Sequence, residues 1–187
     1  MNNIIDIMTY NPNKDDKFFL DANIWMYLFC PIGDYGKDTV TKYSAFLKKA
    51  IQSKSPIFIS SLVLSEFFNA YVRLEFNILK SNAPLRYQDF KRDFRKTDDY
   101  QRLMVDIKTT VKTQILKVSK RVDDNFSNMN LEGLFDNIDQ SDFNDNYYLT
   151  MANLEKFKIV TNDYDFAFSR ATSVPILTAN KKMLKEA

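Results

Sequence analysis

Acidic residues follow two apolar runs whose composition is typical of buried strands. Asp21 ends the run KFFLD, and Asp163 follows Ile159 and Val160 in the stretch KIVTNDYDF. If the two strands are parallel, both carboxylates lie outside the carboxyl edge of one sheet, where α/β proteins collect their ligands. Carboxylates in this position are suited to holding a metal ion, and a surface turn is the simpler interpretation.

Three further acids are positioned to join them. Glu66 lies about one and a half turns into an apolar helix that leaves a second predicted strand. Asp142 and Asp145 are three residues apart at the start of another helix, so they share a face. Without a cation, such carboxylates would repel one another and their pKa values would rise. Mg²⁺ and Mn²⁺ prefer oxygen ligands, so we expect one of them as the cofactor.

Each acid also has a structural interpretation. A narrow solvent-exposed stripe on its helix accounts for Glu66. A helix cap or a favourable interaction with the helix dipole accounts for Asp21, Asp142 and Asp145. A turn accounts for Asp163 and Asp165. The recurrence of acids after strands and at helix starts is what favours a common site.

The composition excludes several classes of enzyme. The chain has 187 residues and no histidine, which removes Ser-His-Asp and Cys-His triads and histidine-ligated zinc. Its 3 glycines form no phosphate-binding loop motif. The single cysteine, Cys30, cannot form an internal disulfide and is expected to be buried. The polar N-terminus does not resemble a signal peptide, and no apolar run approaches the ~20 residues of a membrane span, so we expect a cytoplasmic protein.

Charge is distributed unevenly along the chain. The net charge is +2, but residues 84–122 carry 11 Lys and Arg against 5 Asp, whereas residues 123–165 carry 10 Asp and Glu against 2 Lys. The basic segment is a candidate for contacts with phosphates, and a solvated helix face is the alternative. The candidate phosphate-binding residues in this segment are Lys112, Lys117, Lys120 and Arg121.

Short apolar runs alternate with amphipathic helical patterns. Strands are predicted at 17–21, 56–60, 159–161 and 174–179, and helices at 23–29, 39–54, 62–80 and 142–157, with one or two long basic helices over 87–122. Residues 1–16 are expected to be a loosely tethered lead-in. The alternation predicts an α/β fold with a mostly parallel sheet.

Four blocks of the sequence resemble the PIN domain family: FLDANIWMYLF, ISSLVLSEFFNAY, DFNDNYYLTMANLEKFKIVTNDYDF and VPILTAN. The resemblance covers residues 17–80 and 140–180. It implies a single domain over residues 1–187, with a Rossmann-like three-layer α/β/α sandwich, a mostly parallel central sheet and a helical insertion at residues 81–135. It also implies an Mg²⁺- or Mn²⁺-dependent ribonuclease.

The resemblance assigns roles to individual residues. It implies that the catalytic, metal-binding acids are Asp21, Glu66, Asp145 and Asp163. The supporting residues that it implies are Asn23, Thr161, Asp142 and Asp165. The hypothesis is that the carboxylates bind one or two divalent cations that activate water for attack on a phosphodiester.

The expected substrate is single-stranded or structured RNA, and the toxin of a toxin–antitoxin pair is one version of this function. An antitoxin protein and a second copy of the chain are the protein partners left open, and no membrane contact is expected. The alternative is a catalytically inert PIN-like module that binds nucleic acid or protein. A phosphatase of the haloacid dehalogenase type would need a second Asp two residues after Asp21, where the chain has Asn23.

Overall fold

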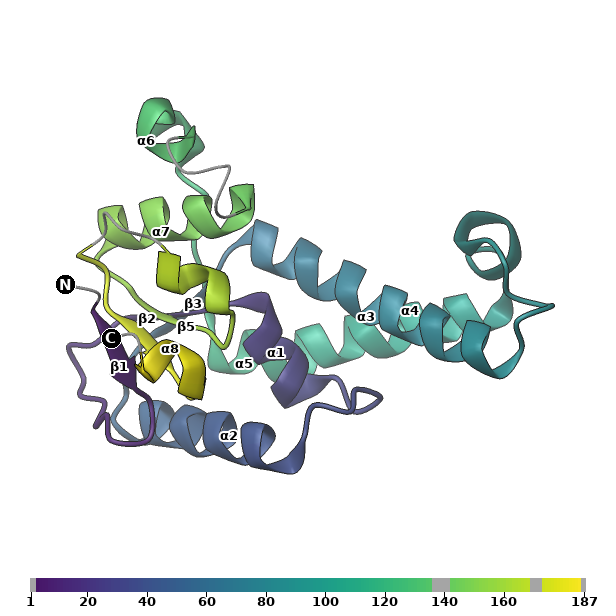
Figure 1. Ribbon diagram of the computed structural model, residues 1–187, viewed down its shortest axis with the longest axis horizontal. Coiled ribbons are helices and arrows are strands. Elements are labelled where there is room, and N and C mark those ends of the chain that lie inside the picture. The colour runs from purple at the N-terminus through teal and green to yellow at the C-terminus, as the bar shows by residue number, and fades with distance from the viewer. Residues whose placement is uncertain (1–2, 136–141, 169–172, 186–187) are drawn as a thin grey trace.

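The central feature of the structure, a computed structural model that describes residues 3–135, 142–168 and 173–185, is a parallel β-sheet (Figure 1). Within these residues six strands pair in the order β1-β6-β5-β2-β3-β4, and every pairing is parallel. The strands are β1 Ile4–Asp6, β2 Phe18–Leu20, β3 Ile57–Ile59, β4 Lys120–Arg121, β5 Lys158–Val160 and β6 Ile176–Thr178. The prediction of an α/β fold with a parallel sheet is confirmed.

Helices connect β2 to β3, β3 to β4 and β4 to β5, as crossovers between parallel strands require. In the described residues the helices are α1 Ala22–Phe29, α2 Lys37–Gln52, α3 Ser61–Asn82, α4 Asp98–Thr110, α5 Leu116–Val118, α6 Leu131–Phe135, α7 Phe143–Glu155 and α8 Lys181–Lys185. Two π-helical turns, Phe90–Phe94 and Val111–Ile115, interrupt the basic region, and 3₁₀ turns lie at Phe126–Asn128 and Tyr164–Phe168. No helix in the described residues has both the length and the apolar character needed to cross a lipid bilayer.

Two neighbouring phenylalanines of β2 show how the layers form. Successive strand residues point to opposite faces of a sheet. Phe18 packs edge-on against Phe46 of α2, with 5.0 Å between ring centroids, whereas Phe19 packs against Tyr148 of α7 at 5.3 Å. Helices α2 and α7 therefore cover opposite faces, which gives the expected three-layer sandwich (Figure 1).

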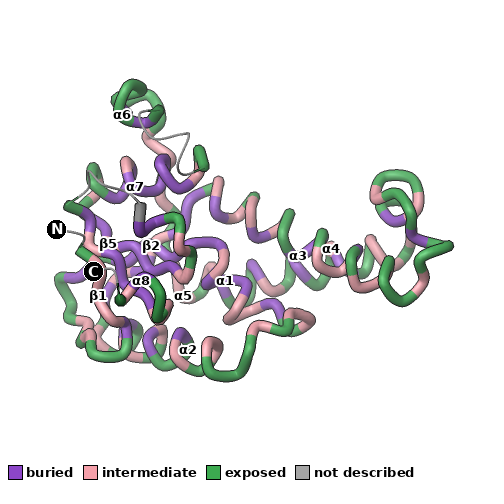
Figure 2. Tube along the Cα trace, viewed as in Figure 1, coloured by how far each residue is buried: buried purple, intermediate pink, exposed green. Residues whose placement is uncertain are grey.

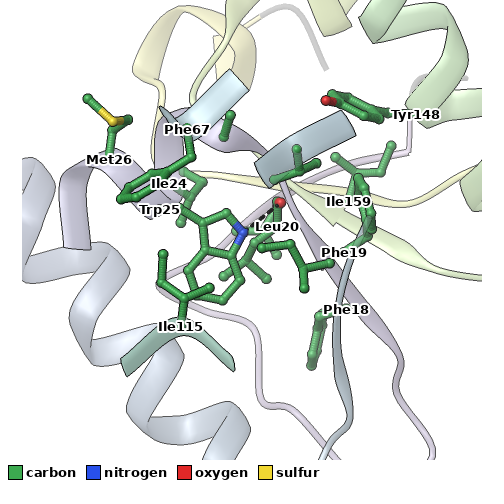
Figure 3. Packing of buried hydrophobic residues seen from close by; sticks show 14 of the residues in the cluster. Phe18, Phe19, Leu20, Ile24, Trp25, Met26, Phe67, Ile115, Tyr148 and Ile159 are labelled. Atoms are coloured by element: carbon green, nitrogen blue, oxygen red, sulfur yellow. Dashed lines mark hydrogen bonds between the residues drawn. The ribbon is translucent and has the colours of Figure 1, made fainter. Parts of the chain in front are cut away.

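The core is closed around Trp25 of α1, directly after β2 (Figure 3). Its indole is fully buried and its Nε1 donates a hydrogen bond to the carbonyl oxygen of Leu20 at 3.1 Å. Burial of the indole N–H is tolerated because this bond satisfies it. The bond fixes α1 to the end of the strand that carries Asp21. Cys30, at the C-terminal end of α1, is buried as expected.

The amino-terminal segment is part of the fold, so the prediction of a loosely tethered lead-in is wrong. Residues 4–6 form β1, which pairs with β6, and Ile7 is 1% exposed. Buried Asp16 accepts from Lys158 Nζ at 2.5 Å and from Tyr10 Oη at 2.9 Å. The prediction failed because most residues of the segment are polar. Its buried acid, Asp16, is nevertheless paired with Lys158, and its few apolar residues complete the edge of the sheet.

Helices α3 and α4 form an arm that extends beyond the sheet, and exposed residues dominate it (Figures 1 and 2). Its aromatic residues pack on one another rather than facing solvent as a group: the ring contacts join Phe76, Tyr87, Phe90, Phe94 and Tyr100. Phe94 is fully buried and Tyr87 nearly so. These rings hold the arm together.

The sequence predicted helix as far as residue 122, but the basic segment leaves the helical conformation before that residue. The chain becomes extended at Ser119, and β4 adds to the open edge of β3. The amide of Val122 also donates to the carbonyl oxygen of Ile59 at 3.1 Å. Pairing with the free edge of β3 supplies hydrogen-bond partners to backbone groups of both strands. This stabilisation outweighs the preference of the segment for a helix.

Candidate active site

A cavity of about 640 Å³ opens at the carboxyl edge of the sheet. Its described lining comes from α1, the loop before α2, the middle of α3, the start of α7 and the turn after β5. The lining residues are Asp21, Ala22, Asn23, Met26, Tyr27, Tyr35, Glu66, Asn69, Ala70, Leu74, Asp142, Asp145 and Asp163. All four predicted catalytic acids are among them, as are Asn23 and Asp142.

Asp21 occupies the N-cap position of α1 but does not cap the helix with its side chain. Its Oδ2 instead accepts from the hydroxyl of Thr161 at 2.7 Å and from Nδ2 of Asn23 at 2.6 Å. The side chain is 7% exposed. These contacts hold the carboxylate towards β5, and the interpretation of Asp21 as a simple cap does not describe them.

Thr161 connects the predicted residues from behind the cavity. It is fully buried and does not line the cavity. While its hydroxyl donates to Asp21, it accepts from the amide of Asp163 at 3.0 Å and from Nδ2 of Asn23 at 3.2 Å. The carbonyl oxygen of Thr161 accepts from Tyr43 Oη at 3.0 Å. One hydroxyl therefore fixes the relative positions of Asp21, Asn23 and the Asp163 backbone.

Glu66 is half-buried and joins α3 to α7. Its carboxylate accepts from Tyr148 Oη and from Nδ2 of Asn144. Sequence reasoning placed Tyr148 on an inner face of its helix but identified neither residue as part of the site. Their spacing of four, which puts two polar donors on one helix face, was the available signal.

Asp142 and Asp145 share the first turn of α7 and differ in environment. Asp142 is exposed and caps the helix: its Oδ1 accepts from the amide of Asp145 at 2.9 Å, as predicted for a cap. Asp145 is 7% exposed and lines the cavity. The capping interpretation therefore applies to Asp142, which also lines the cavity, and Asp145 is the buried acid that α7 places there.

Burial and mutual repulsion disturb the acids of the cavity. Burial raises the pKa of Asp21 to about 7; the hydrogen bond from Thr161 lowers it, and the charges of Glu66 and Asp163 raise it. Burial, together with the charges of Asp142, Asp21 and Asp163, raises the pKa of Asp145 to about 8. Burial also raises the pKa of Glu66, against the hydrogen bonds from Tyr148 and Asn144. No lysine or arginine is among the described lining residues to offset these charges.

Asp163 lines the cavity and also has a role in its own turn. Its side chain is exposed, and Oδ1 accepts from the amide of Asp165 at 3.0 Å. Asp165 is exposed and does not line the cavity. Asp163 therefore both stabilises its turn and lines the cavity. Asp165 contributes only its backbone amide to that turn.

The acids line the same cavity from different elements. In the described part of the chain, no three acidic or cysteine side chains are grouped closely enough to hold a metal ion between them. The basic residues Lys112, Lys117, Lys120 and Arg121 are all exposed and lie outside the cavity lining. The structure thus brings the acids to one cavity and leaves the basic residues on a separate surface.

The sheet order, the position of the cavity and its carboxylates define an α/β domain with an acidic cavity at the carboxyl edge of its sheet. A sequence profile of the family described as PIN domain matches residues 18–172. The chain belongs to the PIN domain family, whose members are generally nucleases and thus hydrolases. None of the curated proteins compared with the chain is similar enough to count as a relative.

Proposed function

We propose that the protein is an endoribonuclease that depends on Mg²⁺ or Mn²⁺. The observation that carries this proposal is the cavity itself: Asp21, Glu66, Asp145 and Asp163 line one space, two of them are buried with strongly raised pKa values, and no described lining residue is cationic. A divalent cation would remove the repulsion that the protein leaves uncompensated.

The chemistry of the donor set fits such a cation. All of the acidic groups offer oxygen atoms, which Mg²⁺ and Mn²⁺ prefer over nitrogen or sulfur. When bound, the cation supplies an activated water and neutralises the charge that develops on the phosphate.

The residues of the chain then have distinct tasks. Thr161 and Asn23 orient Asp21 by holding its Oδ2. Tyr148 and Asn144 hold Glu66 over the cavity, and the cap formed by Asp142 fixes the turn that presents Asp145. The carboxylates of Asp21 and Glu66 are thereby held by neutral donors, which do not neutralise the charge that a cation would meet.

RNA is the proposed substrate because the acidic cavity is accompanied by a basic region. Phosphates would be attracted by Lys112, Lys117, Lys120 and Arg121. The toxin function, the antitoxin partner, the homodimer and the cytoplasmic location stay predictions. The inert PIN-like module is the second candidate, and the absence of a close group of three acids in the described residues is the observation that favours it.

A metal titration combined with an RNA cleavage assay tests the proposal. We expect Mg²⁺ or Mn²⁺ to bind in calorimetry and to support cleavage that EDTA abolishes. Asp145→Asn should weaken both, whereas Asp38→Asn, which alters an exposed acid of α2, should change neither. A protein that binds RNA without binding either metal would be the inert module.

A further inference from the structure

A second cavity, of about 510 Å³, lies beside the candidate active site. Its described lining consists of Ser61, Leu62 and Ser65 from the start of α3, Asp124 and Phe126 after β4, and Phe143 and Tyr147 from α7. The active-site cavity is lined by Glu66 on α3 and by Asp142 and Asp145 at the start of α7, so the two cavities share these helices. The contact of Glu66 with Tyr148 and Asn144, which joins these two helices, therefore separates two neighbouring cavities.

Aromatic rings form one side of the second cavity. Tyr147 is packed between two phenylalanines, with ring centroids 6.2 Å from Phe126 and 5.9 Å from Phe143. Phe126 is 53% exposed and Phe143 is 37% exposed. Large aromatic side chains left this open next to a cavity offer flat apolar surfaces to a ligand, and nucleobases stack on such surfaces.

Asp124 supplies a polar group to the same cavity. Its Oδ2 accepts from the hydroxyl of Ser61, and its backbone oxygen accepts from Tyr147 Oη. Its Oδ1 is shielded from solvent and has no hydrogen-bond partner among the described residues. An acceptor in this state is destabilising, so a ligand that offers an N–H group would be favoured. Asp124 lines the cavity, and because the two oxygens of a carboxylate are equivalent, the group keeps capacity to accept a further hydrogen bond.

We propose that this cavity binds an unpaired nucleobase that carries an amino group, next to the phosphodiester held in the active-site cavity. The aromatic rings would stack on the base, and Asp124 would accept a hydrogen bond from its amino group, as carboxylates do from the exocyclic amine of cytosine. The carboxylate would repel a phosphate, so the base and not the backbone of the RNA enters. This proposal rests on the proposed ribonuclease function.

Fluorescence of short single-stranded RNA with one aminopurine base tests the proposal. The titration is done in EDTA, so that the RNA binds without being cleaved, and the aminopurine is moved along the strand from one RNA to the next. We expect wild-type protein to quench the fluorescence strongly at one position, because stacking quenches this base. Phe126→Leu and Asp124→Asn should each weaken binding of that RNA about tenfold.

The matched control is Asp123→Asn, which removes the same charge from an exposed neighbour that does not line the cavity. It should leave quenching unchanged. In competition with the fluorescent RNA, unlabelled RNA with uracil at that position, which lacks an exocyclic amine, should bind wild-type protein more weakly than RNA with cytosine there. The two competitors should bind Asp124→Asn about equally.

Two results would overturn the proposal. One is equal quenching by wild type, Phe126→Leu and Asp124→Asn. The other is no position-specific quenching by any of them, as expected if the cavity receives a cationic side chain from a protein partner. Failure of the ribonuclease function has a different readout, the absence of metal-dependent cleavage, which the EDTA titration does not measure.

Discussion

At the scale of residues, the acids could be predicted and their partners could not. Asp21, Glu66, Asp145 and Asp163 were recognisable because each follows a strand or lies near the start of a helix, and the structure brings all four to one cavity. Tyr148, the hydroxyl donor to Glu66, could not be identified because the contact depends on how α3 docks against α7. Such a docking angle is set by packing across the whole core and not by local sequence.

Asp163→Asn separates the two roles of this residue. Asparagine retains an Oδ1 that can accept from the amide of Asp165, so the turn should form. It removes one anionic oxygen ligand, so metal affinity should fall at least about tenfold and cleavage should fall with it. Calorimetry and RNA cleavage measure the two effects.

Asp165→Asn is the control for this change, because Asp165 contributes its backbone amide and does not line the cavity. Asp165→Asn should lower metal affinity and RNA cleavage less than Asp163→Asn does. If Asp163→Asn retained full Mg²⁺-dependent cleavage, Asp163 would have a role only in the turn and none in metal binding.

The raised pKa values of Asp21 and Asp145 predict how the stability of the metal-free protein changes with pH. The pKa values of both carboxyl groups are higher in the folded state, about 7 and 8, than in the unfolded chain, where an aspartate has its ordinary pKa of 3.8. The folded state therefore binds more protons between these values, and the free energy of unfolding should decrease as pH rises from about 4 to about 8. Urea unfolding in EDTA measures this decrease.

The same measurement with Asp145→Asn should give a smaller decrease, since one of the two groups no longer titrates. Added Mg²⁺ should also flatten the dependence, because the cation stabilises the ionised carboxylates. If the free energy of unfolding decreased with pH by the same amount in wild type and in Asp145→Asn, the ionisation of Asp145 would not be the cause of the decrease.

At the scale of elements, strands and helices with strong periodicity were predicted well, and elements defined by pairing were not. Strand β2 and helices α2, α3 and α7 lie within a few residues of their expected positions. Strands β1 and β4 were missed because they are short and partly or fully exposed, and only their partners β6 and β3 make them strands. Sheet edges are the part of this fold that local sequence specifies least.

Tyr148→Phe tests the connection between α3 and α7. The change removes the hydroxyl that donates to Glu66 and leaves the ring that packs on Phe19. We expect a loss of about 1–2 kcal/mol in the free energy of unfolding, because a half-buried carboxylate loses a donor. Metal affinity should also fall, because Glu66 is held less firmly.

Tyr147→Phe is the matched control in the same helix. Its hydroxyl donates to the backbone oxygen of Asp124 and not to an acid of the active-site cavity. Urea unfolding should show a loss of stability, while calorimetry should show unchanged metal affinity. Equal metal affinities for the two variants would mean that Glu66 does not depend on Tyr148.

At the scale of the whole molecule, the uneven charge along the sequence becomes a division between surfaces. The carboxylates surround the active-site cavity, and the basic residues lie on the elements that follow the arm, in the π-helical turn at Val111–Ile115, α5 and β4 (Figure 1). An acidic cavity repels RNA unless the attraction comes from elsewhere on the protein. The basic surface is therefore expected to govern binding and the cavity to govern chemistry.

Neutralising Lys112, Lys117, Lys120 and Arg121 together tests this division. Each phosphate contact on a single strand contributes roughly 0.7 to the slope of log affinity against log salt, so four lost contacts should reduce the slope by about 3. RNA affinity at low salt should fall accordingly, while metal affinity should stay unchanged because these residues lie outside the active-site cavity. The control neutralises four exposed lysines elsewhere, Lys14, Lys37, Lys48 and Lys54, and so changes the net charge equally. If both variants reduce the slope equally, the basic segment attracts RNA only through net charge. If both variants keep the wild-type slope, the basic segment is a solvated helix face that does not contact RNA.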